Sequence, residues 1–128
     1  MTLRHLLLAF LVSFAVSTVA AAAEKHAYTP AGFAAAQAAG KPILVHIHAP
    51  WCPTCQAQDP ILNKLEADPK FSDLSVFRVD FDSQKDAVRA LRATTQSTLI
   101  VFKGAKEVAR SVGETNPAAI AALLDNAL

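Results

Sequence analysis

The stretch that decides the fold is residues 43–55, which read ILVHIHAPWCPTC. Its first half is a short apolar run with β-branched residues, a pattern typical of a buried strand. Its second half places two cysteines, Cys52 and Cys55, where the strand pattern ends and a helical pattern begins. A CxxC motif between a strand and a helix indicates a reactive cysteine pair.

Helix and strand patterns alternate on both sides of this stretch. The sequence predicts helices over residues 30–39, 52–67, 83–92 and from 116 onward, and strands over 42–47, 76–80, 99–102 and 108–112. A short edge strand is also predicted near residues 26–29. This alternation predicts an α/β fold in which a central mixed β-sheet of four or five strands is flanked by helices on both faces.

Three local signals set helix boundaries. Thr29 before Pro30 and Asn116 before Pro117 are typical N-cap pairs. Ser83, with an acidic residue three positions later, predicts a capping box at a third helix start. Pro60 lies inside the helix that follows the cysteines, and we expect it to kink this helix without ending it.

Composition narrows the class of protein. The chain has 128 residues, of which 52% are hydrophobic and 18% charged, so it is neither disordered nor collagen-like and has room for one domain. Lys and Arg number 12 and Asp and Glu number 11, without a basic stripe, so we expect no nucleic-acid partner. Two cysteines cannot build a disulfide scaffold, which leaves the pair free for chemistry.

The first 23 residues predict a secretory signal peptide. A basic start, an apolar middle over residues 6–16 and four alanines at 20–23 match the three parts of such a segment. The alternative is an uncleaved membrane anchor, since the run from residue 6 to residue 23 is long enough to approach a span. We expect cleavage, a periplasmic location and one domain over residues 24–128.

The two cysteines have different expected roles. Unpaired N–H groups at a helix start favour an anion, and in CxxC motifs the pKa of the first thiol falls from about 8.5 into the range of ~3.5–7.5. We expect Cys52 to be the solvent-accessible nucleophile and Cys55 to resolve the mixed disulfide, forming a Cys52–Cys55 disulfide. The alternatives are a zinc half-site, which lacks a second CxxC, and an inert bridge, which gains little from so short a loop.

The sequence resembles the thioredoxin family over residues 26–128. The matching residues are Ile43 to Val45, Ala49, Trp51 to Cys55, Pro60, Val76 to Asp82, Thr98 to Lys103 and Gly113. The resemblance implies a thioredoxin-like fold and a thiol–disulfide oxidoreductase that acts on protein cysteines. It further implies a monomer without cofactor or metal, with a thiol–disulfide redox partner that could be a membrane electron donor.

Residues beside the cysteines are expected to shape the reaction. Trp51 would form a platform beside the pair, while Pro53 and Thr54 would tune its potential. The Pro53-Thr54 dipeptide is similar to that of periplasmic thiol reductants serving cytochrome c maturation, which favours a reductant over an oxidant.

The loop before the third long strand departs from the family. The family places a cis-proline before the Thr-Leu pair, and this chain has Ser97 before Thr98. A cis bond before a non-proline residue costs about 2.5–4 kcal/mol, so we predict a trans Gln96–Ser97 bond. In the family this loop guides the incoming peptide, which assigns Ser97 and Thr98 to substrate binding. Ser97 either donates a hydrogen bond to the thiolate or is a simple loop serine.

Two histidines form the other departure. His46 stands where the family carries a buried Asp behind the second cysteine, and imidazole could help to move the proton of Cys55. A core histidine with a hydrogen-bond partner is the alternative. His48 points to the same side of the strand, so a copper or zinc chaperone using the cysteines and these histidines is the second functional hypothesis. A redox-inactive binding module is the third.

Overall fold

The computed structural model describes residue 15 and residues 17–128. The elements are β1 (Glu24–Ala27), α1 (Pro30–Ala38), β2 (Pro42–His48), α2 (Pro53–Glu66), the 3₁₀ helix η1 (Pro69–Phe71), β3 (Ser75–Asp80), α3 (Lys85–Ala90), β4 (Thr98–Lys103), β5 (Lys106–Val112) and α4 (Pro117–Asp125). The strands form one sheet in the order β1-β3-β2-β4-β5. Strand β3 pairs in parallel with β1 and β2, whereas β4 pairs antiparallel with β2 and β5. The predicted mixed α/β sheet is therefore confirmed, with five strands.

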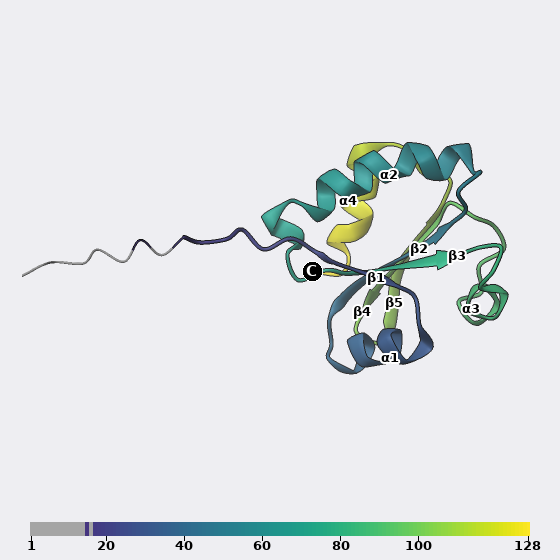
Figure 1. The fold of residues 1–128 in the computed structure, drawn as a ribbon, viewed down its shortest axis with the longest axis horizontal. Helices are drawn as coiled ribbons and strands as arrows, with labels where there is room; N and C mark the ends of the chain where they lie inside the picture. The colour runs from purple at the N-terminus through teal and green to yellow at the C-terminus, as the bar shows by residue number, and fades with distance from the viewer. Residues whose placement is uncertain (1–14, 16) are drawn as a thin grey trace, which may run out of the picture.

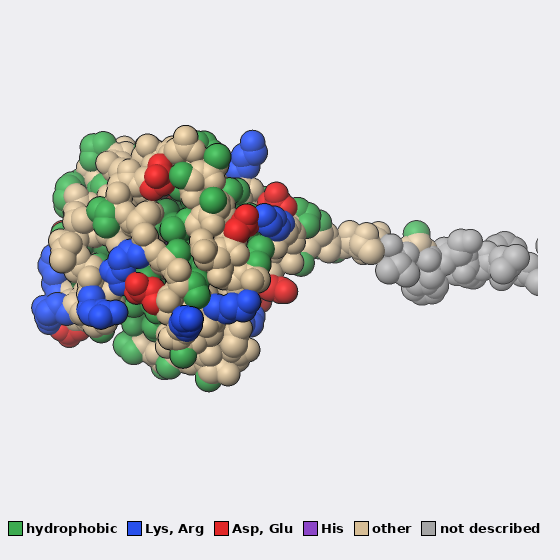
Figure 2. Space-filling model, turned by 180° about the vertical axis from the view of Figure 1, so that it is seen from behind, with side chains coloured by type: hydrophobic (Ala, Val, Ile, Leu, Met, Phe, Trp, Pro, Cys, Tyr) green, Lys and Arg blue, Asp and Glu red, His purple; other side chains and the backbone are tan. Residues whose placement is uncertain are grey.

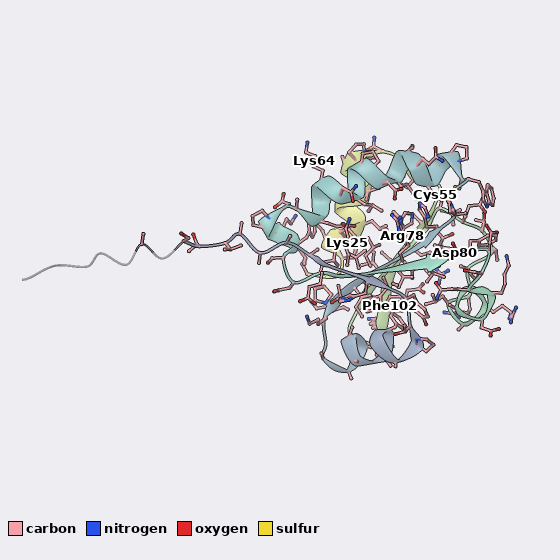
Figure 3. The ribbon with its side chains drawn as sticks, viewed as in Figure 1. Lys25, Cys55, Lys64, Arg78, Asp80 and Phe102 are labelled. Carbon is pink, nitrogen blue, oxygen red and sulfur yellow. The ribbon has the colours of Figure 1, made fainter. Side chains whose placement is uncertain are left out.

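Helices cover both faces of this sheet (Figure 1), with α2 and α4 on one face and α1 and α3 on the other. Alternate residues of β2 point to opposite faces. Ile43, Val45 and Ile47 join the core under α1 and α3, and Leu44 joins the core under α2 and α4. His46 follows Leu44 on the α2 face, so a polar side chain enters that layer. In Figure 3, Cys55 lies on the same side of the sheet.

Most boundary predictions are confirmed. Thr29 caps α1 by accepting the N–H of Gly32 at 3.0 Å, and Asn116 caps α4 by accepting the N–H of Ala119 at 3.0 Å. Pro60 lies within α2, which continues past it to Glu66. The short edge strand exists as β1, although it begins two residues earlier than predicted.

The predicted capping box at Ser83 is wrong. Helix α3 begins only at Lys85, and its N-cap residue Gln84 makes no side-chain capping bond. The Ser83 hydroxyl donates to Asp80 Oδ1 at 2.8 Å, and the Ser83 N–H donates to the same oxygen at 2.7 Å. The carboxylate at the end of β3 thus holds Ser83 in the turn before α3, so Ser83 does not cap that helix.

Most of the predicted signal peptide lies outside the described residues. Within residue 15 and residues 17–128, no helix is long and apolar enough to cross a membrane. On the face shown in Figure 2, basic and acidic side chains are interspersed with hydrophobic and uncharged ones.

Candidate active site

Cys52 occupies the N-cap position of α2, directly before Pro53. The backbone N–H of Cys55 donates to Cys52 Sγ at 3.1 Å. Proline at the first helical position removes an N–H that has no partner within the helix, so the start of α2 loses no hydrogen bond there. The sulfur therefore lies among the unpaired N–H groups of a helix start, a setting that suits an anion.

The accessibility expected of Cys52 is not found. The residue is only 2% exposed and packs with Ala49, Cys55 and Phe81. The cause is the capping geometry, because the side chain turns inward over the helix end to accept the Cys55 N–H. The free protein therefore exposes little of Cys52 to solvent.

Cys55 is fully buried one turn further along α2. Burial raises the pKa of its thiol to about 11, and the neighbouring Cys52 adds to the effect. Backbone hydrogen bonding from Ala49 and Ser97 lowers the same pKa without cancelling the rise. At neutral pH Cys55 therefore keeps its proton, which suits the resolving role expected of it.

Trp51 forms the exposed rim of the site. Its side chain is among the most exposed large apolar groups of the described residues, at 57%, and its Nε1 donates to Asp82 Oδ2 at 2.7 Å. Pro53 is exposed and Thr54 is half-buried beside it. The structure thus brings all three predicted tuning residues next to the cysteine pair.

The Gln96–Ser97 bond is trans, as predicted, since no cis peptide bond occurs in the described residues. Ser97 adopts a φ of +57°, the left-handed region that few residues other than glycine favour. Its hydroxyl donates to the Gln96 carbonyl at 2.6 Å, and it is not directed at either cysteine in this structure. Thr98 is buried, and its hydroxyl donates to the Thr95 carbonyl at 2.8 Å.

His46 is buried on the α2 face, 1% exposed, with its Nε2 at 3.0 Å from Oε1 of Gln58. Burial lowers its pKa from 6.5 to about 4, and the positive charge of Arg78 is the next cause. The carboxylate of Asp59 and the hydrogen bond to Gln58 oppose this shift. His46 is therefore neutral at pH 7.

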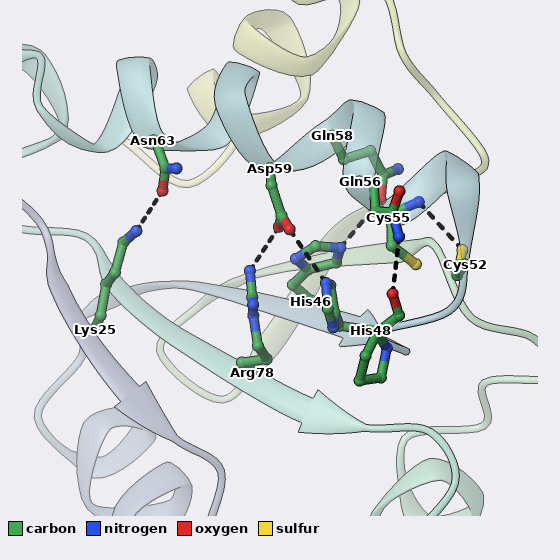
Figure 4. Close-up of polar contacts among 11 residues, drawn as sticks. Lys25, His46, His48, Cys52, Cys55, Gln56, Gln58, Asp59, Asn63 and Arg78 are labelled. Atoms are coloured by element: carbon green, nitrogen blue, oxygen red, sulfur yellow. Dashed lines mark hydrogen bonds and ion pairs between the residues drawn. The ribbon is translucent and has the colours of Figure 1, made fainter.

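His48 lies beside His46, with the ring centroids 5.2 Å apart and the rings nearly perpendicular. Its Nε2 is 3.2 Å from Asp59 Oδ2, and the other oxygen of that carboxylate accepts from Arg78 at 2.6 Å (Figure 4). Both histidines line a cavity of about 610 Å³ between α2, β1 and β3, which we call the polar groove; Asp59, Arg78 and Lys25 also line it.

The donor atoms do not form a metal centre. In the described part of the chain, no group of three or more His, Cys, Asp or Glu side chains is placed to hold a metal ion. The Nε2 atoms of His46 and His48 are engaged by different residues of α2, Gln58 and Asp59. The geometry therefore gives the metal-chaperone hypothesis no support.

Three residues of this site were not predicted from sequence: Gln58, Asp59 and Arg78. A signal existed for Gln58, because the buried residues of α2, Cys55, Gln58, Leu62 and Glu66, follow the spacing of one helix face. A glutamine on that face must find a buried partner. Asp59 and Arg78 carried no comparable signal, since charged residues on a helix and a strand are usually solvated.

The chain matches the thioredoxin family model over residues 24–126. Thioredoxin-2 of Saccharomyces cerevisiae is 36% identical over 80 residues, which cover 62% of this chain and 74% of that protein. The solved structure of Trxlp from Edwardsiella tarda is 46% identical with a TM-score of 0.77, covering 79% of this chain and 98% of that one. Thioredoxin from Malassezia sympodialis, at 19% identity and a TM-score of 0.70, shares the fold over 81% of this chain and 91% of its own.

Proposed function

This chain belongs to the thioredoxin family and is a thiol–disulfide oxidoreductase, and we propose that it works in the periplasm as a reductant of protein disulfides. The observation that carries the mechanism is the pairing of a sulfur at the helix N-cap with a buried thiol one turn later. Cys52 Sγ accepts the Cys55 N–H, while burial keeps the proton on Cys55. This asymmetry separates the attacking sulfur from the resolving one.

The reaction moves two electrons in two exchanges. The thiolate of Cys52 attacks one sulfur of a substrate disulfide, which breaks the substrate S–S bond, forms a mixed disulfide and releases the first substrate thiolate. Cys55 then loses its proton and attacks Cys52 Sγ, releasing the second substrate thiolate and leaving a Cys52–Cys55 disulfide. The two released thiolates take up protons as free thiols. A donor dithiol, which we propose to be membrane-bound, reduces the protein again.

His46 is proposed to assist the loss of the Cys55 proton. It lies buried on the face of the sheet that α2 covers, the side on which Cys55 also lies (Figure 3), and it is neutral at pH 7, because burial lowers its pKa to about 4. A neutral imidazole has one nitrogen free to accept a proton. Charge on His46 would stabilise a nearby thiolate, since opposite charges within a few ångströms favour the ionised form.

The proposed export and the proposed direction of electron flow are both supported by the sequence. The basic, apolar and small-residue pattern of residues 1–23 supports secretion, and the Pro53-Thr54 pair supports a reducing role. The proposal is of a monomer, because nothing in the reaction requires a second copy of the chain. The proposal also includes an increase in the exposure of Cys52 when a substrate binds, since the residue is only 2% exposed in the free protein.

The equilibrium potential of the Cys52–Cys55 couple against glutathione tests the direction. CxxC proteins span from about −270 mV for thioredoxin to about −120 mV for the oxidant DsbA. We expect a potential in the more negative half of this range, closer to that of thioredoxin. A value close to −120 mV would contradict the reducing role and leave the oxidoreductase chemistry in place.

Two serine variants test the order of attack. Cys55→Ser should accumulate a mixed disulfide with a substrate protein, because Cys52 can attack but nothing resolves the product. Cys52→Ser should give no such adduct. Equal adduct yields from the two variants, measured by mass spectrometry, would contradict the assigned roles. Recovery of the protein in the periplasmic fraction, shortened at its N-terminus, tests the proposed export.

A further inference from the structure

Gln58 connects three segments through one buried amide. It is fully buried, and its Nε2 donates to the backbone carbonyls of Ser97 at 3.2 Å and Glu114 at 3.0 Å. Its Oε1 lies 3.0 Å from His46 Nε2. Strand β2, the loop before β4 and the loop before α4 therefore meet at this side chain.

The two carbonyls determine which way the amide points. A carbonyl oxygen accepts hydrogen bonds and cannot donate one, so the two partners require the NH₂ end of Gln58. Reversing the amide would place an oxygen against two oxygens and forfeit both bonds. Oε1 must therefore face His46, and it can only accept.

It follows that His46 Nε2 carries a hydrogen. A neutral imidazole has one N–H, so Nδ1 holds the lone pair. The two ring nitrogens point in different directions, and Figure 4 shows the His46 ring between Gln58 on one side and the Asp59–Arg78 pair on the other. The ring edge away from Gln58 thus lies toward the polar groove, which His46 lines.

We propose that Gln58 is a positioning residue that holds His46 with its hydrogen on Nε2, so that the ring accepts a proton only at Nδ1, from the polar groove. The inference rests on the proposed function and deepens it. In the resting state Nε2 cannot accept a proton, so a proton that Cys55 loses can reach His46 only at Nδ1, through the polar groove.

Three charged or titratable groups around this ring act on its pKa. They are His48 from its own strand, Asp59 from α2 and Arg78 from β3. Arg78 opposes a proton at Nδ1, and Asp59 favours one. Of these two charges in the groove, that of Arg78 has the larger effect, so the groove adds to the lowering of the His46 pKa by burial.

Long-range ¹H–¹⁵N correlation of the histidine rings tests the tautomer in the reduced, ¹⁵N-labelled full chain. We expect the wild type to show a single Nε2–H tautomer for His46. Gln58→Met, of similar size but without the amide, should lose this single tautomer. Gln56→Met is the matched control, because Gln56 lies two residues away on the exposed side of α2 and donates only to the Pro50 carbonyl. An Nδ1–H tautomer in the wild type, or an unchanged ring in Gln58→Met, would overturn the proposal.

Gln58→Glu provides a second measurement. Its carboxylate gives up both bonds to the Ser97 and Glu114 carbonyls, so the variant should be less stable than the wild type. It keeps an acceptor opposite the Nε2 hydrogen and, when ionised, also stabilises imidazolium, so the His46 pKa should rise by about one unit or more in the folded variant. If neither variant folds, the wild-type tautomer still decides the proposal. A His46 pKa unchanged from the wild type would contradict a direct Gln58–His46 bond. An alkylation pH profile for Cys55 that is unchanged in His46→Asn would overturn the reaction role of His46 while leaving the tautomer assignment intact.

Discussion

At the scale of single residues, His46 shows how position alters chemistry. An imidazole in water has a pKa near 6.5, but burial beneath α2 and the charge of Arg78 lower that of His46 to about 4. The surroundings of the ring therefore set its pKa as much as the residue type does.

The buried histidine should make stability depend on pH. The pKa of His46 is about 4 in the folded protein and 6.5 in the unfolded chain. Between pH 4 and pH 6.5 His46 is therefore protonated in the unfolded chain and neutral in the folded protein. The contribution is complete above pH 6.5 and is lost as the pH falls toward 4, amounting to about 3 kcal/mol. Urea unfolding of His46→Asn should show a shallower fall than the wild type. Equal slopes for the two proteins would refute the assignment.

Ser97 is held in a backbone conformation that proline cannot adopt. Its φ is +57°, whereas the proline ring holds φ near −65°. Ser97→Pro should therefore lower the free energy of unfolding by more than about 1 kcal/mol, while Ser97→Gly should change it by less than about 1 kcal/mol. Urea unfolding measures both. A proline variant as stable as the wild type would show that the loop can rebuild around a different backbone.

At the scale of elements, the register between β2 and β3 determines which charges His46 meets. His46 pairs with Arg78 and His48 pairs with Asp80, so the parallel register brings a guanidinium beside the buried imidazole. Helix α2 crosses above and contributes Asp59, which bonds both His48 and Arg78. The polar groove is thus formed by residues of the three strands β1, β2 and β3 and of the helix α2.

Removing the guanidinium should raise the pKa of His46. Arg78 is the second cause of the lowered value after burial, so Arg78→Met should move the pKa above 4 while leaving it below 6.5. An NMR titration of the His46 ring measures the shift. Arg89→Met is the control, because Arg89 is exposed on α3 on the opposite face of the sheet. A His46 titration that is identical in both variants would remove Arg78 as a cause.

At the scale of the whole molecule, the sheet divides the interior into two cores. The core under α1 and α3 contains the aromatic cluster of Tyr28, Phe33, Phe77 and Phe102. The core under α2 and α4 is mainly aliphatic and is interrupted near the cysteines by His46 and Gln58. The buried polar contacts are therefore concentrated at the reactive end of one layer.

Among the residues that the structure describes, both cores are built from residues 24–128, apart from a peripheral contact by Ala23. A chain that begins at Glu24 loses the hydrogen bond from the Ala23 N–H to the Glu66 carbonyl, worth about 1 kcal/mol. We expect it to unfold cooperatively, with a free energy of unfolding within about 1 kcal/mol of the full chain. Chemical denaturation followed by circular dichroism measures this, and a non-cooperative transition would show that earlier residues are needed for the fold.

The order of helices and strands and the position of the cysteine pair could be predicted from local sequence preferences. The apolar run before Cys52, the caps at Thr29 and Asn116 and the alternation along β2 depend on neighbours within a few residues. Such preferences act over one helical turn or one strand, so a sequence displays them directly. The trans bond before Ser97 was predictable for the same reason, because it depends on one residue type.

Partners distant in the chain were decided only by tertiary structure. Gln58 meets carbonyls 39 and 56 residues away, and Arg78 reaches His46 only through strand pairing. The covering of Cys52 likewise depends on how its side chain turns and on Phe81. The burial of a group, its pKa and the direction of its hydrogen bonds depend on what packs around it. Those neighbours are distant in the sequence, so local patterns do not reveal them.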